Sequence, residues 1–145
     1  MSEFKSILVP IDFSDVSNRA FFAAVGLAKG LGASLHAVHI VQMHPSSIPE
    51  SGKINMDEIE AAEEKAANDS LDKLIEEHGE GLEISKSLVH GDPVSQISKM
   101  VKEVHADMIV MGTHGRTGVA HLMMGSVAES VLRNADVPVM CVKGL

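Results

Sequence analysis

Short apolar runs alternate along the chain with longer stretches in which an apolar residue recurs every three or four positions. The short runs are typical of buried strands, and the longer spacing is typical of one face of a helix. Ser14 offers a side-chain cap to the first helix, and Asp92 followed by Pro93 begins the third. The pattern predicts, in order, strand 7–9, helix 15–31, strand 35–41, helix 56–78, strand 82–89, helix 93–104, strand 108–111, helix 126–134 and strand 137–142.

Apolar strands that are separated by amphipathic helices indicate a parallel sheet with helices on both faces. We therefore expect one α/β domain over residues 1–145, with a Rossmann-like open sheet of five parallel strands in the order 3-2-1-4-5 and four helices. Pro138 lies near the beginning of the last predicted strand, Val137 to Val142, and proline cannot donate to a ladder. This strand is therefore expected at an edge of the sheet.

Composition and charge narrow the function. The chain has 145 residues, of which 45% are apolar, enough for the core of one domain. Its 20 acidic residues outnumber its 12 Lys and Arg, which argues against binding to nucleic acid or to an anionic membrane surface. Cys141 is the one cysteine and no stretch approaches about 20 apolar residues, so we expect a cytoplasmic protein with no internal disulfide and no membrane insertion.

Two loops are expected to flank the position at which the strand order reverses, between the first and fourth strands. In open parallel sheets, ligands bind beyond the carboxyl ends of the strands at this position. One loop follows Pro10 and contains Asp12, and the other begins at Gly112 and contains Gly115. Topology and composition therefore indicate the same place.

The second loop has a glycine pattern that suits a phosphate group. Two residues separate Gly112 from Gly115, and nine more lead to Gly125 and Ser126, where a helix is predicted to begin. Successive backbone N–H groups in such a loop can bind an anion, and a helix N-terminus adds unpaired donors. A plain strand-to-helix connection would use the same glycines, and neither the P-loop nor the dinucleotide-binding motif is present. The spacing alone leaves both interpretations open.

Three motifs together resemble those of a known family. They are G-x2-G-x9-G-S from Gly112 onward, Pro10-x-Asp12-x-Ser14, and Val89-x-Gly91-x-Pro93. Their order and spacing resemble the universal stress protein family over nearly the whole chain. Within that family the glycine pattern marks the ATP-binding branch, so the resemblance implies that this chain binds ATP.

The resemblance also implies a role for each residue that matches the motifs of the family. Asp12, beside Pro10, would contact adenosine, and the backbone of Ile40 would contact adenine. The residues implied to contact phosphate and ribose are Gly112, Gly115, Gly125, Ser126 and Val127, with Met111 beside the first of them. Ala128 stands where this branch often has a hydroxyl residue, which would remove one phosphate hydrogen bond.

Several residues have a simpler interpretation beside the functional one. Asp12 could be a turn residue that accepts hydrogen bonds from nearby backbone N–H groups. His114 and Arg116 could neutralise phosphate charge, or could be two solvated loop residues. His36 and His39 lie three positions apart on one strand and therefore point to opposite faces, which argues against a shared metal site.

The expected function is that of a nucleotide-dependent switch in a stress response. ATP, accompanied by Mg²⁺, would lie in the crevice between the first and fourth strands and change what a protein partner meets. The family also implies a homodimer through the last strand, Val137 to Val142, and an exposed strand edge favours such pairing. No residue pair suggests a catalytic site, so we expect binding in preference to catalysis. A slow ATPase is one alternative. The others are an AMP-type sensor and a dimeric scaffold that binds no nucleotide.

Overall fold

The sheet has the strand order that the hydrophobic pattern predicts. The computed structural model describes residues 4–42, 56–114 and 125–144. Five parallel strands lie in the order β3-β2-β1-β4-β5, which confirms the expected arrangement. The elements are β1 (Ser6–Pro10), α1 (Asp15–Leu31), β2 (Ser34–Val41), α2 (Met56–His78), β3 (Ile84–His90), α3 (Pro93–Glu103), β4 (Met108–Gly112), α4 (Ser126–Asn134) and β5 (Val139–Val142).

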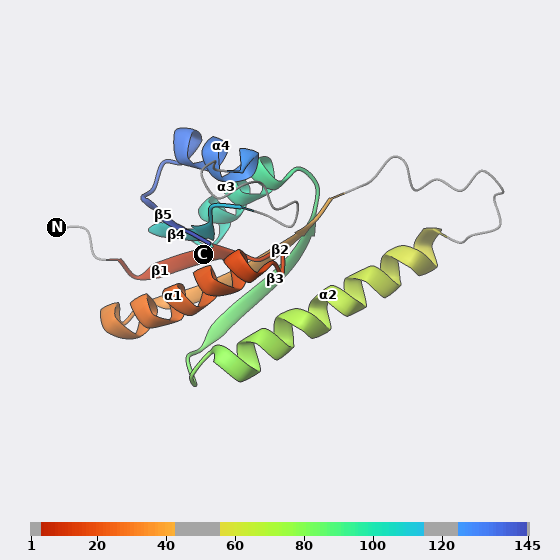
Figure 1. The fold of residues 1–145 in the computed structure, drawn as a ribbon, viewed down its shortest axis with the longest axis horizontal. Helices are drawn as coiled ribbons and strands as arrows, with labels where there is room; N and C mark the ends of the chain where they lie inside the picture. Colours follow the sequence, from red (N-terminus) through yellow and green to blue (C-terminus); the bar gives the residue numbers. More distant parts are fainter. Residues whose placement is uncertain (1–3, 43–55, 115–124, 145) are drawn as a thin grey trace.

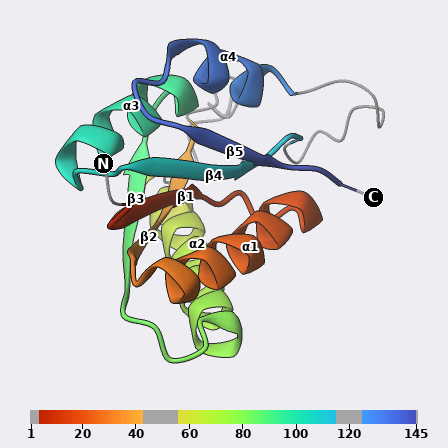
Figure 2. The same ribbon diagram turned by 90° about the vertical axis from the view of Figure 1, so that its left-hand side faces the viewer.

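Helices cover both faces of the sheet, as Figures 1 and 2 show. α1 and α2 lie on one face, and α3 and α4 lie on the other. Side chains alternate along a strand, so β1 serves both cores: Ile7 and Val9 pack with residues of α1, whereas Leu8 packs with residues of α3 and α4. All three are fully buried, which explains why the strands appear in the sequence as continuous apolar runs.

The strand order reverses at β1, which lies between β2 and β4. β1 pairs with β2 along its whole length, but its ladder with β4 consists of Ile7 with Met108 and Leu8 with Ile109. That ladder ends before either strand does. The carboxyl ends of β1 and β4 therefore border the place where ligands bind in open parallel sheets.

The last strand is shorter than predicted. It begins at Val139 and not at Val137, because Pro138 has no N–H group to donate to the ladder. The carbonyl of Pro138 still accepts a hydrogen bond from the backbone nitrogen of Ile109, at 2.9 Å. β5 lies at one edge of the sheet, as the proline predicted.

The third strand also begins two residues later than predicted, at Ile84 and not at Leu82. The backbone nitrogen of Leu82 donates to the carbonyl of Gly79, at 3.0 Å, in the turn that follows α2. A residue committed to this turn cannot take its place in the ladder. Every other predicted boundary lies within one residue of the observed one.

The first half of α2 extends beyond the sheet (Figure 1). Of the apolar stripe along this helix, Leu71 and Leu74 are buried, whereas Ile59, Ala62 and Ala66 are exposed. The stripe predicts which way the helix faces, but not how far it runs past the sheet. Among the described residues, no helix is both long and apolar enough to cross a membrane.

Most of the net negative charge of the chain lies on α2. This helix carries nine acidic residues and two Lys. The remainder of the chain carries 11 acidic residues and 10 Lys and Arg, so it is nearly neutral. Polar side-chain contacts attach α2 to β3: His90 Nε2 lies 2.9 Å from Glu64 Oε1, and Lys86 forms an ion pair with Asp72. The negative balance therefore characterises one exposed helix and not the surface as a whole.

Candidate functional site

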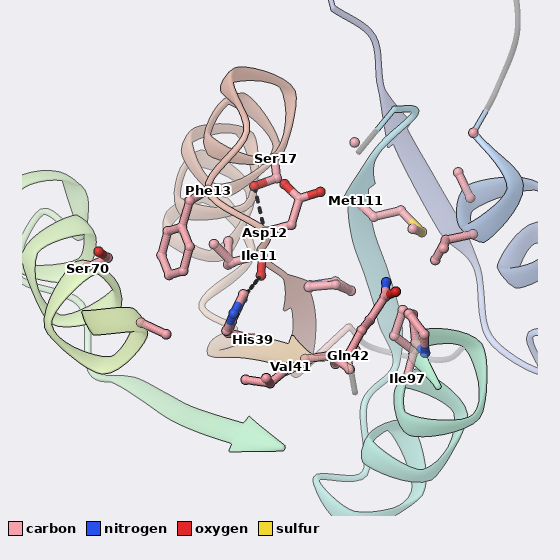
Figure 3. A pocket seen from close by; sticks show the side chains of 18 of the residues that line it. Ile11, Asp12, Phe13, Ser17, His39, Val41, Gln42, Ser70, Ile97 and Met111 are labelled. Carbon is pink, nitrogen blue, oxygen red and sulfur yellow. Dashed lines mark hydrogen bonds between the residues drawn. The ribbon is translucent and has the colours of Figure 1, made fainter. Parts of the chain in front are cut away.

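A cavity of about 780 Å³ lies at the carboxyl ends of the strands (Figure 3). It is bordered by the ends of β1, β2 and β4, by the N-terminal turn of α4, and by one side of α2. The residues predicted for the site that line it are Pro10, Asp12, Ile40, Met111, Gly112, Gly125, Ser126 and Val127. The other two, Gly115 and Arg116, lie outside the described residues.

One wall of the cavity is the loop between β1 and α1, which is fixed by its own polar side chains. Asp12 Oδ1 accepts a hydrogen bond from the Ser14 nitrogen at 2.9 Å, and the Asp12 nitrogen donates to Ser17 Oγ at 3.1 Å. Ser14 Oγ in turn accepts from the Ser17 nitrogen at 3.1 Å and caps α1. The turn role of Asp12 is therefore real, and it holds the carboxylate at the border of the cavity.

The same loop is attached to β2 through Ile11. Its nitrogen donates to the Val38 carbonyl at 2.8 Å, and its carbonyl is 2.7 Å from Nδ1 of His39. The His39 ring is 8% exposed and lies 4.8 Å from the ring of Phe13, centroid to centroid. Figure 3 shows both rings beside the cavity.

Sequence reasoning assigned no role to His39 or Phe13. The spacing rule did place His39 on the face opposite to His36, and the contacts of the two side chains confirm this. Phe13, two residues after Ile11, has a φ of 65°. A left-handed phenylalanine has no signal in the apolar pattern.

The opposite wall is the first turn of α4, which begins without a side-chain cap. Its N-cap residue is Gly125, and within the described residues no side-chain cap hydrogen bond forms at this end. The Gly125 nitrogen itself donates to the Thr113 carbonyl, at 2.6 Å. The first N–H groups of a helix have no partner within the helix, so an uncapped first turn that lines a cavity can bind an anion.

Gly112, at the end of β4, packs directly against the first turn of α1. A Cβ at this position would lie 2.7 Å from Val16 Cγ1 and 3.2 Å from the Ser17 nitrogen. The end of β4 therefore touches the first turn of α1 with no room for a side chain. This requirement holds whether or not a ligand is bound.

The apolar wall of the cavity belongs to the core beneath α3 and α4. Ile97 and Met111 are buried there, and Ile40 and Val127 pack against the same cluster. Ala128 also lines the cavity and is 2% exposed, so its methyl group is part of this core. Apolar lining with a few polar groups is typical of small-molecule sites.

The ionisable groups give little sign of a reactive centre. Among the described residues, no three His, Cys, Asp or Glu side chains converge on a metal position. His114 Nδ1 lies 2.9 Å from Thr113 Oγ1, and its buried Nε2 has no hydrogen-bond partner within the described part of the chain. Burial raises the pKa of the Cys141 thiol on β5, which disfavours the nucleophilic thiolate. Burial also lowers the pKa of His36, which is hydrogen-bonded to Ser87 at 2.8 Å.

Solved structures with this arrangement include nucleotide complexes. The structure of the protein MJ0577 superposes with a TM-score of 0.85 at 25% identity and covers 99% of both chains. A universal stress protein solved in complex with cAMP has a TM-score of 0.69 at 25% identity, over 98% of both chains. The universal stress protein of Archaeoglobus fulgidus, solved in complex with dAMP, has a TM-score of 0.65 at 27% identity, over 98% of this chain and 100% of that one.

Sequence comparison gives the same family. Universal stress protein MJ0531 of Methanocaldococcus jannaschii is 36% identical over 142 residues, which are 97% of this chain and 82% of that protein. A putative universal stress protein of Staphylococcus aureus is 30% identical over 99% of this chain and 86% of its own length. The sequence profile of the universal stress protein family matches residues 3–143. The chain therefore belongs to the universal stress protein family.

Proposed function

We propose that this protein binds ATP, accompanied by Mg²⁺, in the cavity between β1 and β4 and acts as a nucleotide-dependent switch. One observation carries the proposal: the uncapped first turn of α4 lines the same cavity as Asp12 and the apolar wall. A site with anion-binding donors at one side and an apolar wall with a carboxylate at the other suits a nucleotide, which has a charged tail and a planar base.

Each part of the nucleotide has a group that suits it. The Asp12 carboxylate can accept hydrogen bonds from the ribose hydroxyls, and Pro10 and Ile40 border the place for the base. The residues proposed for the phosphates are Gly112, Gly125, Ser126 and Val127, together with Gly115 and Arg116 from the sequence motif. Met111 lies on the apolar wall beside the first glycine.

Relatives support an adenine nucleotide as the class of ligand. Two universal stress proteins that superpose on this chain are in complex with cAMP and with dAMP, both of which contain adenine and one phosphate group. The cavity volume of about 780 Å³ lies within the range of roughly 300–1,000 Å³ that small-molecule sites occupy.

Mg²⁺ would be held mainly by the nucleotide. This ion keeps several water ligands and usually binds through one or two carboxylates and the phosphates, so it needs no cluster of three protein ligands. Its role would be to neutralise phosphate charge. Backbone donors and a metal ion also explain how a chain with a net charge of -8 can hold phosphates without a surface of Lys and Arg.

An AMP-type sensor is the second candidate, and one observation favours it. The complexes with cAMP and dAMP described above each contain a nucleotide with one phosphate group. A monophosphate would use the apolar wall and Asp12 in the same way but would reach fewer of the donors at α4. The two candidates therefore differ in how much affinity the second and third phosphates add.

We also propose a homodimer that pairs through β5. This strand lies at an edge of the sheet, and Met140 on it is 38% exposed. Unpaired N–H and C=O groups along an edge strand favour pairing with a second copy. Light scattering on the purified protein tests this: a mass of one chain at micromolar concentration would contradict it. The cytoplasm stays the expected compartment.

Calorimetric titration of ATP, ADP and AMP, each with and without Mg²⁺, tests the proposed ligand. Denaturing freshly purified protein and identifying the released small molecules first shows whether the site is already filled. Affinity that increases from AMP to ATP supports the proposal, and a preference for AMP supports the sensor. Failure to bind Mg-ATP at millimolar concentration would overturn the proposal.

A further inference from the structure

A buried histidine, His39, connects the end of β2 to the loop that carries Asp12. We infer that His39 is a positioning residue, which sets where Asp12 lies relative to Ile40 and thereby sets the affinity for the nucleotide. The inference rests on the proposed function, because these two residues are proposed to contact the ribose and the base.

Two consecutive residues of β2 hold both backbone groups of Ile11. Its nitrogen donates to the Val38 carbonyl at 2.8 Å, and its carbonyl lies 2.7 Å from His39 Nδ1. A carbonyl only accepts, so Nδ1 must carry the proton of this hydrogen bond. Ile11 directly precedes Asp12, and His39 directly precedes Ile40, so this single bond links the two proposed contacts of the nucleoside.

The histidine ring also supports the turn that follows. Phe13 has a φ of 65°, a left-handed conformation that is uncommon for a bulky residue and persists where surrounding contacts hold it. Its ring packs against His39 at a centroid distance of 4.8 Å and an angle of 40°. Because His39 is 8% exposed, it is a fixed part of the wall that the loop packs on.

This role differs from that of the serines in the same loop. Ser14 and Ser17 fix Asp12 relative to α1, whereas His39 fixes it relative to β2. Without the bond from His39, the Ile11–Val38 hydrogen bond alone would attach the loop to β2, so the nucleotide would have to order more of the loop, and that cost would reduce the affinity. His36 on the same strand is a natural control, because it points to the other face and bonds to Ser87.

A matched pair of variants isolates the hydrogen bond. His39→Asn places an amide N–H close to the position of Nδ1. The leucine of His39→Leu has nearly the same shape as asparagine but has no hydrogen-bond donor. Both lose the ring contact with Phe13 equally. We expect His39→Leu to bind ATP about tenfold more weakly than His39→Asn, because a loop without this hydrogen bond must be ordered when the nucleotide binds. His36→Leu should bind ATP as the wild-type protein does.

Two further measurements exclude a general loss of structure. Urea unfolding identifies variants that are unfolded under the binding conditions. Nitrogen-15 spectra of the unliganded wild-type protein should show the imidazole of His39 protonated at Nδ1, independently of any ligand. An Nε2-only tautomer would overturn the inference even if His39→Asn and His39→Leu did not fold.

The outcomes separate the inference from the proposed function. ATP binding by the wild-type protein with equal affinities for His39→Asn and His39→Leu would overturn the role of His39 alone. Absence of ATP binding by the wild-type protein would overturn the proposed function and the inference with it. A rescue by asparagine that leucine does not provide would establish the positioning role.

Discussion

The first turns of α1, α3 and α4 all line the cavity, and α1 and α4 begin differently. α1 is closed at its N-terminus by side chains: Ser14 Oγ accepts from the Ser17 nitrogen, and Asp15 follows in the first turn. α4 begins at Gly125 with no side-chain cap. The first arrangement consumes the helix donors internally and holds Asp12 in place, and the second leaves backbone donors for an external anion. In the proposed complex, the ends of these two helices would serve the two ends of the nucleotide.

α3 also begins at the cavity, where Pro93 is part of the lining, and its N-terminus has a side-chain cap. Asp92 caps it, with Oδ2 accepting from the Ser95 nitrogen at 2.9 Å and from Ser95 Oγ at 3.0 Å. Of the three helices whose N-caps the structure describes, α1 and α3 are capped by a side chain and α4 is not. Of these three helix starts at the cavity, α4 is therefore the one whose backbone donors suit an external anion.

The largest effect is expected at the close contact between the end of β4 and the first turn of α1. In Gly112→Ala, the new Cβ would lie 2.7 Å from Val16 Cγ1, so α1 must shift away from β4. We expect a loss of about 2 kcal/mol in the free energy of unfolding, measured with urea, and ATP binding weakened by more than about tenfold. Gly26→Ala is the control, since nothing lies within 4 Å of a Cβ there and alanine favours the helix by about 0.5–1 kcal/mol. Equal stability of the two variants would contradict this packing.

The next effect concerns the carboxylate at the end of the fixed wall. Asp12→Asn keeps an oxygen for the Ser14 nitrogen, and Asp12→Ala keeps none. Hydrogen bonds to a charged group contribute about 1.5–3 kcal/mol, so we expect ATP affinity to fall about tenfold for asparagine and up to about 100-fold for alanine. Calorimetry with ATP measures this. If Asp12→Ala bound ATP as tightly as the wild-type protein, the carboxylate would have no role in binding and would serve only to hold the turn.

A smaller effect is expected from the cap of α1. Ser14→Ala removes the acceptor for the Ser17 nitrogen and should lower the free energy of unfolding by about 1 kcal/mol. ATP affinity should fall only a few-fold, because Ser14 acts on the ligand through Asp12. Ser14→Thr, which retains a hydroxyl, serves as the control. A loss of affinity larger than that of Asp12→Ala would instead place Ser14 against the ligand.

The smallest effect is a pH dependence of stability at the N-terminal cap of α3. Hydrogen bonds from Ser95 hold the pKa of the Asp92 carboxyl below its ordinary value. The stability that this carboxylate contributes is therefore complete above the ordinary pKa and is lost as the pH falls through the lowered one. We expect the difference in urea midpoint between wild type and Asp92→Asn to shrink below about pH 4. A difference that stays constant from pH 7 to pH 3 would contradict this.

The apolar pattern predicts the sheet well because strands buried on both faces leave an unambiguous signal in the sequence. It does not predict where α2 leaves the sheet, since Ile59 and Ala66 continue the stripe of Leu71 without being buried. The late start of β5 at Val139 depends on one absent N–H group. Boundaries and helix extent follow from tertiary packing, which the periodicity of one segment does not contain.

The candidate site shows the same division. Asp12 and Gly125 could be predicted because a motif and the topology both indicate them. His39 could not, because the apolar pattern does not show that its side chain reaches the backbone carbonyl of Ile11. Gly112 was predicted for its likeness to a phosphate loop, and the structure adds a packing reason that requires no ligand.

One substitution tests directly whether the open end of α4 receives the phosphates. Gly125 has φ -64° and ψ 155°, a conformation that aspartate adopts readily as an N-cap. Gly125→Asp should therefore stabilise α4 by about 1 kcal/mol while its carboxylate occupies the donors and repels phosphate. We predict that competition titrations show ATP affinity at least about tenfold lower and adenosine affinity unchanged. Equal ATP affinities in the variant and the wild type, or equal losses for ATP and adenosine, would contradict a phosphate site at α4.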